Sequence, residues 1–340
     1  MLGAFVRIVD LFSGLGGLTI GAYQAAKILN QDFEIYLASD FEIACSDFYQ
    51  LNFAQFINTF HTDDITKLDT SSLERKKVDY LFAGPPCQGH SDLNNLSRRS
   101  DPRNTLYLET IKFIEHFQPR VFMIENVPTV VHSKQGVVET AKELLHNRYD
   151  VIELVIDFEK LGIAQSRKRH ILLGSINEIP SNILERLYND KIPATLLDVV
   201  GDIVDVKSEC MFDSASRMSS ENKSRADYLF ENDMYDLPNF LRPRCHRSKH
   251  SYKSMYGRMY PDKPAQTITG GFGSMGQGRF LHPLKRRVIT PHEAARIQGL
   301  PDWLNFNQVL KRRQLHQMIG NAVPPILSQE LIITMESVYG

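Results

Sequence analysis

The chain has 340 residues, of which 42% are hydrophobic and 23% charged, so it can bury a substantial core as one large domain or two unequal ones. No stretch approaches the roughly 18 uncharged apolar residues that a membrane-spanning helix needs, and the chain starts with a strand-like run rather than a secretion signal, so we expect a cytoplasmic protein without a membrane partner. The net charge of -1 excludes a global attraction to nucleic acid, and four scattered cysteines (Cys45, Cys87, Cys210 and Cys245) predict neither disulfides nor a metal site.

Short apolar runs alternate with helix-patterned stretches through the first half of the chain. The predicted strands cover residues 5–12, 34–39, 56–60, 78–83, 120–125, 149–156 and 170–175. The predicted helices cover residues 18–29, 43–52, 106–117 and 137–146. This alternation predicts a doubly wound α/β sheet with each helix on one of its faces.

The pattern weakens after residue 176. Residues 200–235 are polar and mixed, and residues 236–283 are rich in Gly, Pro, Tyr and basic side chains without a sustained period. Helical patterns return at residues 291–298 and 325–338, the second of which begins with proline. We therefore expect a second, smaller and irregular domain, and a last helix that docks on the first domain.

A glycine-rich segment, Asp10-Leu-Phe-Ser-Gly14-Leu-Gly16-Gly17, joins the first predicted strand to the first helix. Glycines at this place allow a ligand to approach the helix N-terminus, as in nucleotide sites, although a plain tight loop has the same pattern. Thr19 stands where the dinucleotide fingerprint has its third glycine, which argues against a nicotinamide cofactor.

Polar and aromatic residues also follow the second and third predicted strands. Asp40 and Phe41 suit ribose hydroxyls and an adenine ring, although Asp40 is equally suited to capping the next helix. Asp64 and Ile65 offer a polar contact to an adenine amine and an apolar wall.

Three further strand ends carry reactive side chains. Gly84-Pro85-Pro86-Cys87-Gln88 places a thiol at the carboxyl edge of the sheet, where Cys87 is either a nucleophile or a small buried hydrophobe. Glu125 ends the next strand, and Arg167 and Arg169 precede the last one. A buried carboxylate and guanidinium must bind each other or a polar ligand, so this pattern predicts a structural salt bridge or a substrate site.

In this order the motifs resemble the DNA (cytosine-5)-methyltransferases of bacterial restriction–modification systems along nearly the whole chain. The matching segments are DLFSGLGG at Asp10, ASDF at Ala38, DDIT at Asp63, GPPCQGHS at Gly84, DPRNTLYLE at Asp101, IENV at Ile124, QSRKR at Gln165, RVITPHEAARIQGLP at Arg287 and QMIGNAVPP at Gln317. PPCQ followed by ENV and QxRxR is specific to this family. The departures are small: His90 replaces the usual aromatic residue, Asp63 a common glycine, and Asp40 a frequent glutamate.

The resemblance implies a Rossmann-like methyltransferase domain that binds S-adenosylmethionine, comprising residues 1–190 and 318–340. It also implies a smaller target-recognition domain at residues 191–285 and a hinge region at residues 286–317. The implied cofactor-binding residues are Phe12, Ser13, Gly14, Leu15, Gly16, Gly17, Asp40, Phe41, Asp64, Ile65, Pro85, Leu106, Asn321 and Ala322.

The family's chemistry gives the strand-end residues their expected roles. Cys87 adds to carbon 6 of a flipped-out cytosine and so activates carbon 5 toward the methyl group. Glu125 donates a proton to ring nitrogen 3 and accepts a hydrogen bond from the exocyclic amine. Arg169 binds the cytosine carbonyl oxygen, with Arg167 in support, and Asn126 braces the catalytic loop.

A segment without acidic residues, 237–261, interleaves basic and aromatic side chains. Alone it suits either a solvated face or a nucleic-acid surface; the resemblance places it in the target-recognition domain. The expected DNA-binding residues are Gln88, Ser91, Arg242, Arg244, Arg247, Lys249, Lys253 and Arg258. The expected partner is double-stranded DNA, bound by a monomer in the prokaryotic cytoplasm near the nucleoid, with a cognate restriction endonuclease acting separately.

Three alternatives remain at this point. A tRNA cytosine-5 methyltransferase has nearly the same catalytic fold, but its characteristic CFT element is missing from the sequence. A catalytically silent DNA-binding relative is opposed by the intact Cys87, Glu125 and Arg169, and a nicotinamide oxidoreductase is opposed by Thr19.

Overall fold

The computed structural model describes residues 5–86, 105–133, 136–206, 208, 210–247 and 254–339. The chain divides into two compact units. The first comprises Met1–Asp157, Lys168–Asp190 and Val323–Gly340, and the second comprises Phe158–Arg167 and Lys191–Ala322. Among the described helices, none combines the length and apolar character needed to cross a membrane.

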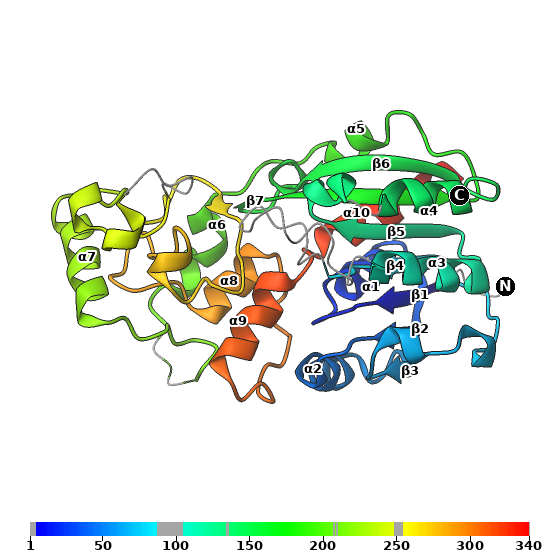
Figure 1. The fold of residues 1–340 in the computed structure, drawn as a ribbon, viewed down its shortest axis with the longest axis horizontal. Coiled ribbons are helices and arrows are strands. Elements are labelled where there is room, and N and C mark those ends of the chain that lie inside the picture. The colour runs from blue at the N-terminus through cyan, green and yellow to red at the C-terminus, as the bar shows by residue number, and fades with distance from the viewer. Residues whose placement is uncertain are drawn as a thin grey trace. The chain divides into compact units, whose positions relative to one another are not determined.

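A seven-stranded sheet forms the centre of the first unit (Figure 1). Its strands are β1 Phe5–Leu11, β2 Asp32–Ser39, β3 Ile57–His61, β4 Tyr80–Ala83, β5 Val121–Asn126, β6 Asp150–Asp157 and β8 Lys168–Ser175. They lie in the order β3-β2-β1-β4-β5-β8-β6, and only β8 runs antiparallel to its neighbours. This confirms the predicted doubly wound fold and the seven predicted strands.

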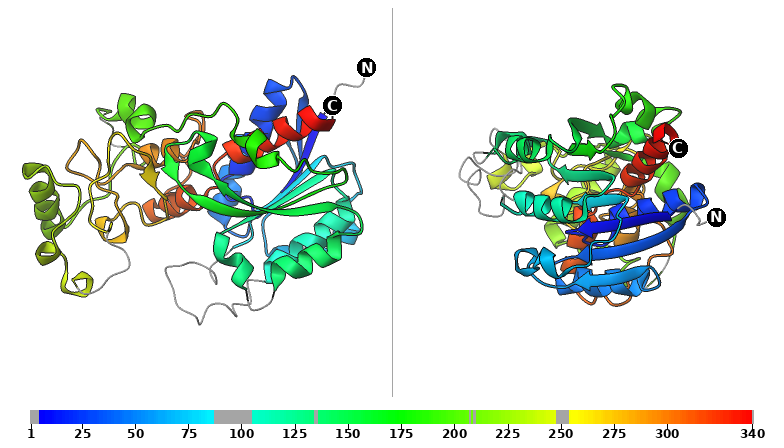
Figure 2. Two further views of the ribbon diagram at one scale, coloured as in Figure 1. Left: turned by 90° about the horizontal axis from the view of Figure 1, so that it is seen from above. Right: turned by 90° about the vertical axis from the view of Figure 1, so that its right-hand side faces the viewer.

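Helices cover both faces of this sheet. They are α1 Gly17–Ile28, α2 Ile43–Phe53, α3 Thr105–Phe117, α4 Val137–Leu145, α5 Ile183–Tyr188 and α10 Ile326–Tyr339. Helices α3 and α4 lie on one face, and α1 and α10 pack together on the other (Figure 2). The core under α3 and α4 joins apolar side chains from the central strands, including Val9, Leu81 and Phe122, to Tyr107 and Ile114 of α3.

Helix α10 belongs to the first unit although it lies at the other end of the sequence from α1. The Ser328 hydroxyl donates a hydrogen bond to the Leu18 carbonyl at 2.7 Å. Gly17 and Gly21 of α1 face the start of α10 so closely that a Cβ at either position would lie about 2 Å from the carbonyl oxygen of Val323 or Pro325. The expected docking of the last helix is confirmed.

The strand order reverses between β1 and β4, because the chain goes from β1 to β2 and β3 on one side and from β4 to β5 on the other. In open α/β sheets, ligands bind outside the carboxyl ends of the strands at such a point. The glycine-rich segment after β1 and Gly84 after β4 both lie there.

The second unit contains more loop than regular structure. Its helices are α6 Leu196–Val200, α7 Ser220–Glu231, α8 Pro291–Ile297 and α9 Arg312–Asn321, and β7 Gln165–Ser166 pairs in parallel with β9 Ala265–Gln266. The predicted helix at 291–298 is confirmed, whereas α6, α7 and α9 were not predicted. Helix α7 buries only Ala226 and Leu229, too few apolar residues to give a helical pattern.

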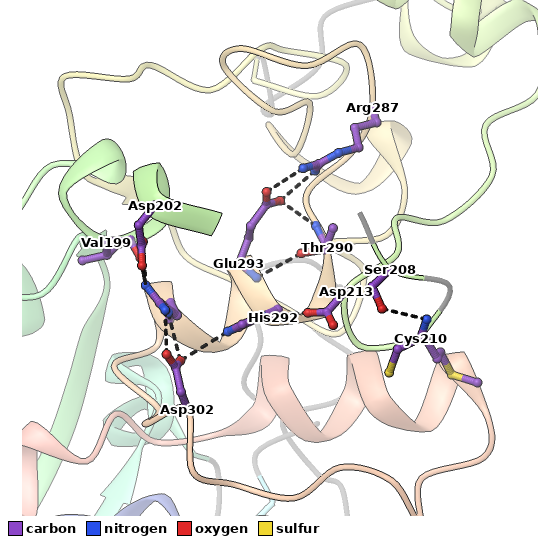
Figure 3. A network of polar contacts seen from close by, with 12 residues as sticks. Val199, Asp202, Ser208, Cys210, Asp213, Arg287, Thr290, His292, Glu293 and Asp302 are labelled. Carbon is purple, nitrogen blue, oxygen red and sulfur yellow. Dashed lines mark hydrogen bonds and ion pairs between the residues drawn. The ribbon is translucent and has the colours of Figure 1, made fainter. Parts of the chain in front are cut away.

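A buried carboxylate organises the start of α8. Glu293 accepts hydrogen bonds from both terminal nitrogens of Arg287 at 2.8 and 2.7 Å and from the Thr290 backbone at 2.8 Å (Figure 3). The Thr290 hydroxyl oxygen accepts a hydrogen bond from the Glu293 backbone, which completes a capping box. The charge of Glu293, 1% exposed, is thus fully paired, which fixes the turn that leads into α8.

Charged side chains also tie α8 to neighbouring loops of the same unit. His292 lies between Asp213, 2.8 Å from its Nδ1, and Asp302, 3.2 Å from its Nε2 (Figure 3). Arg296 contacts both Asp302 and Asp202. The family motif that begins at Arg287 therefore supplies framework contacts in this unit.

Candidate active site

The glycine-rich segment forms a turn in which three residues adopt left-handed backbone geometry. Phe12 has a φ of 57°, Gly14 of 57° and Gly16 of 86°. A Cβ at Gly16 would lie 2.7 Å from the Phe53 ring. Because a larger residue at Gly16 would be strained by both backbone and contacts, glycine is required where the chain turns into α1.

Asp40 connects this turn to the end of β2. Its Oδ2 accepts a hydrogen bond from the Gly14 backbone at 2.7 Å, and its Oδ1 accepts one from the Glu42 backbone at 2.8 Å. Burial raises the pKa of Asp40, while these two N–H groups lower it. Each oxygen keeps a second lone pair, so the carboxylate can still accept hydrogen bonds from a ligand.

Two further predicted cofactor contacts lie on neighbouring segments of this unit. The Phe41 side chain is 67% exposed. Asp64 caps the short helix Ile65–Lys67, and its Oδ1 accepts hydrogen bonds from the Thr66 backbone at 3.0 Å and hydroxyl at 2.8 Å. These bonds lower the pKa of Asp64, which keeps it an acceptor at neutral pH.

A buried chain of polar side chains, which was not predicted from the sequence, supports the glycine turn. The Thr19 hydroxyl donates to Asp10 Oδ2 at 2.7 Å and lies 2.5 Å from the Tyr49 hydroxyl. All three side chains are at most 1% exposed, and burial raises the pKa of Asp10 to about 7. The available signal was Thr19 itself, a polar residue among the apolar positions of the first helix.

The carboxylate and guanidinium predicted from the strand ends meet at the carboxyl edge of the sheet. Arg169 Nε lies 2.9 Å from Glu125 Oε1, with 16% and 9% of the two side chains exposed. The contact is an ion pair without hydrogen-bond alignment, so within the described part of the chain the buried Oε1 has no aligned donor. Such an oxygen is unfavourable unless a ligand group satisfies it.

Glu125 also lies beside the loop that leads to Cys87. Its Oε2 is 3.9 Å from the position of a Cβ built on Gly84, and the Phe12 carbonyl is 4.0 Å from that same position. The Asn126 side-chain amide donates to the Pro85 carbonyl at 3.2 Å, so the expected bracing of this loop is confirmed. Cys87, Gln88 and Ser91 lie outside the described residues.

Arg167 lies in the second unit and is 3% exposed. Its Nη1 donates to the carbonyls of Ile268 at 3.4 Å and Gly320 at 3.5 Å. Beside it, the Gln165 side chain bonds the Ile268 backbone at 2.9 Å and the Gln298 side chain at 2.7 Å. The buried side chains of Gln165 and Arg167 thus join four separate segments of the unit, a role that the QSRKR motif did not reveal.

The remaining predicted cofactor and DNA residues have different environments. Leu106 packs partly buried against the core of the first unit, while Asn321 and Ala322 lie at the end of α9 in the second. Arg242 and Arg258 are 9% and 8% exposed, and Arg244 and Arg247 are exposed. Lys249 and Lys253 lie outside the described residues. In the described ranges, no group of three or more His, Cys, Asp or Glu residues is arranged to hold a metal ion.

Comparison with known proteins identifies the class of enzyme that this fold and site define. Residues 6–337 match the family model of the C-5 cytosine-specific DNA methylases. The chain therefore belongs to this family and is a DNA (cytosine-5)-methyltransferase, as predicted. This result excludes the nicotinamide oxidoreductase.

Individual relatives agree with this assignment. The chain is 44% identical over 342 residues to type II methyltransferase M1.BsuMI of Bacillus subtilis, covering 96% of this chain and 80% of that protein. It is 30% identical over 347 residues to type II methylase M.HgiDII of Herpetosiphon aurantiacus, covering 97% and 94%.

Solved structures show the same fold. A prophage-encoded protein (E. coli) described as a DNA modification methyltransferase superposes with a TM-score of 0.68 at 22% identity, covering 98% of this chain and 99% of that one. S. pombe Dnmt2 methyltransferase superposes with a TM-score of 0.69 at 18% identity, covering 98% and 100%.

Proposed function

We propose that this enzyme transfers a methyl group from S-adenosylmethionine to carbon 5 of a cytosine turned out of duplex DNA, within one short sequence. In a restriction–modification system this methylation protects host DNA from a separately acting endonuclease. The observation that supports the proposal best is the buried Glu125–Arg169 pair beside Gly84. Within the described part of the chain, Glu125 Oε1 has no aligned hydrogen-bond donor and can accept one from a substrate.

The first unit offers a site that fits S-adenosylmethionine. The glycine turn brings backbone close to a ligand, Asp40 can accept hydrogen bonds from ribose hydroxyls, and the exposed Phe41 ring can lie against adenine. Asp64 and Ile65 provide an acceptor for the adenine amine and an apolar wall. When bound, the cofactor supplies an electrophilic methyl group on a sulfonium.

In the sequence, Cys87 comes two residues after Pro85. The Pro85 carbonyl accepts a hydrogen bond from the Asn126 side chain. Its thiolate adds to carbon 6 of the cytosine, which makes carbon 5 nucleophilic enough to take the methyl group. Glu125 donates a proton to ring nitrogen 3, where negative charge develops, and accepts a hydrogen bond from the exocyclic amine. Arg169 binds the carbonyl oxygen and keeps Glu125 oriented.

The product forms when carbon 5 loses its proton, the Cys87 sulfur leaves carbon 6 as a thiolate and the proton on ring nitrogen 3 returns to Glu125, which restores the aromatic ring. An ordered water is the proposed base for that proton. Since this geometry cannot be reached inside the helix, the cytosine must leave the base stack, at a cost of a few kcal/mol. Gln88, Ser91 and the segment 270–278 are the proposed fillers of the vacated space.

The experiment is methyl transfer from labelled S-adenosylmethionine to mixed-sequence DNA and to tRNA, by the wild type and by Cys87→Ala, with deaminative sequencing of the DNA. Label in the cytosine of one short DNA sequence, abolished by Cys87→Ala, is the expected result. Label in tRNA alone would show that the substrate is RNA rather than DNA. Undiminished methylation by Cys87→Ala would show that Cys87 is not the nucleophile.

A further inference from the structure

Residues 239–247 of the second unit form a loop of two short 3-10 turns, Asn239–Leu241 and Arg244–His246, here called the arginine loop. Each turn is preceded by a proline, Pro238 or Pro243, whose ring fixes the backbone φ angle. The loop lies within the segment 237–261, which is rich in basic and aromatic residues.

Three arginines hold this loop by binding backbone carbonyls. Arg225 Nε donates to the Leu241 carbonyl at 3.0 Å, and Arg242 Nε donates to the Leu237 carbonyl at 3.1 Å. Arg247 Nε donates to the Arg242 carbonyl at 2.7 Å. The charges of these arginines therefore contribute to the loop's own structure.

Two further contacts close the loop. The Asn239 side chain donates to the Arg247 carbonyl at 2.9 Å, which joins the ends of the loop. The His246 ring packs edge-on against Tyr256, with 5.6 Å between centroids, and Tyr256 belongs to the buried core of the unit. The backbone from which the other side chains project is thus fixed before any ligand binds, which lowers the entropic cost of recognition.

Arg244 differs from the other arginines of this segment. It is exposed, and its side chain makes no hydrogen bond or ion pair with any described residue. By contrast, Arg258 donates to the Pro283 carbonyl at 2.8 Å, pairs with Asp233 and stacks on Phe230. Arg244 therefore keeps all five guanidinium donors for a partner.

An exposed aromatic residue accompanies it on the same loop. Phe240 is 65% exposed, and its ring lies edge-on to that of Tyr228, with 6.4 Å between the ring centroids. A fork of hydrogen-bond donors and an apolar ring are the two kinds of group that read a guanine edge and a thymine methyl in the DNA major groove.

From this geometry we infer that Arg244 is a specificity-determining residue, which binds O6 and N7 of one guanine in the methylated sequence, and that Arg242 and Arg247 position it. The inference rests on the proposed sequence-specific methylation of DNA. Arginine makes this contact through a rigid planar fork of two parallel donors, whereas a lysine ammonium has the same charge but not this fixed geometry.

The test is to methylate a DNA library of randomised sequence with the full-length wild type, Arg244→Lys, Arg244→Gln and the control Arg217→Lys, and to sequence the products after deamination. Arg217 is also an exposed arginine without a described side-chain partner, and it lies outside the arginine loop. Thermal unfolding of each variant shows whether it is folded.

We expect Arg244→Lys and Arg244→Gln to lose discrimination at one guanine·cytosine pair of the sequence by about ten- to a hundredfold, and Arg217→Lys to keep the wild-type preference at that pair. The salt dependence of DNA binding by Arg244→Lys should match the wild type, because the charge is retained.

Unchanged specificity in Arg244→Gln would overturn the inference, even if this variant binds all sequences more weakly, because the loss of a phosphate contact lowers affinity without changing sequence preference. Wild-type methylation of one defined sequence establishes the proposed function independently. If the wild type methylates cytosines regardless of sequence, or does not methylate DNA at all, the proposed function is overturned and the inference fails with it.

Discussion

In the proposed mechanism, Glu125 is the residue that transfers a proton to the cytosine ring. It is 7% exposed, and its buried Oε1 has an ion-pair partner in Arg169 but no aligned donor among the described residues. A carboxyl group in this setting can exchange a hydrogen with a ring nitrogen without competition from bulk water. Glutamine has nearly the same shape as glutamate and retains one carbonyl oxygen, but it cannot donate a proton to the ring nitrogen.

We predict that Glu125→Gln lowers kcat for DNA methylation by about a hundredfold or more, while the KM for S-adenosylmethionine stays close to the wild-type value. The matched control is Glu139→Gln, an exposed glutamate on α4. Steady-state kinetics at saturating DNA measure both values. If Glu125→Gln keeps the wild-type kcat, proton transfer by Glu125 is not part of the mechanism.

Asp10 gives a second prediction for a single residue, because burial raises its pKa from the ordinary 3.8 to about 7. The folded protein therefore binds a proton more tightly at Asp10 than the unfolded chain does. The stabilisation is fully present below about pH 4 and is lost as the pH rises to about 7; the pKa difference corresponds to about 4 kcal/mol.

In Asp10→Asn this pH dependence should disappear, since asparagine still accepts the Thr19 hydrogen bond but does not titrate. Urea unfolding at pH 5 and pH 8 should show the wild type losing more stability than the variant over this range. Equal losses in both proteins would contradict an Asp10 that is protonated in the fold.

At the scale of elements, the contact between α1 and α10 links the two ends of the chain. A Cβ on Gly21 would lie 1.9 Å from the Pro325 carbonyl and 2.2 Å from the Ser328 hydroxyl. The helices cannot keep this distance with a methyl group between them. Because α1 begins at the glycine turn, its displacement should also move the proposed cofactor site.

Gly21→Ala should therefore destabilise the protein by about 1–3 kcal/mol and raise the KM for S-adenosylmethionine. The control is Gly201→Ala, where a Cβ meets nothing within 4 Å and the backbone is already helical, so its stability should be unchanged or slightly higher. Chemical unfolding compares the two variants. A Gly21→Ala protein as stable as the wild type would show that α1 and α10 need not lie this close.

The elements around the sheet could be predicted because their apolar residues repeat with the period of a strand or a helix. The pairing of Glu125 with Arg169 followed from two strand ends that share an edge of the sheet. Thr19 and Tyr49 could not be paired from the sequence, since 30 residues and a helix–strand–helix path separate them. In the second unit, α7 buries only Ala226 and Leu229 and so gave no clear pattern. In α9, Leu315, Met318 and Ile319 do have helical spacing, a signal that the prediction missed.

The distribution of charge explains how the whole molecule combines a net charge of -1 with DNA as its substrate. Many basic side chains are neutralised within the fold, as Arg287 is by Glu293 and Arg296 by Asp202 and Asp302. Exposed cations without such partners among the described residues, such as Arg244, are the ones that we propose to contact the nucleic acid. We therefore expect DNA affinity to depend on a few side chains rather than on the overall charge.

The proposed mechanism requires a bond between the Cys87 sulfur and carbon 6 of the target cytosine. The most direct measurement is the reaction of the wild type and Cys87→Ser with S-adenosylmethionine and a duplex whose target cytosine carries fluorine at carbon 5. Fluorine cannot leave as a proton does, so the adduct should persist, and mass spectrometry of the digest should place the nucleotide on Cys87. Turnover of the natural duplex together with no adduct, or an adduct on another residue, would contradict the account.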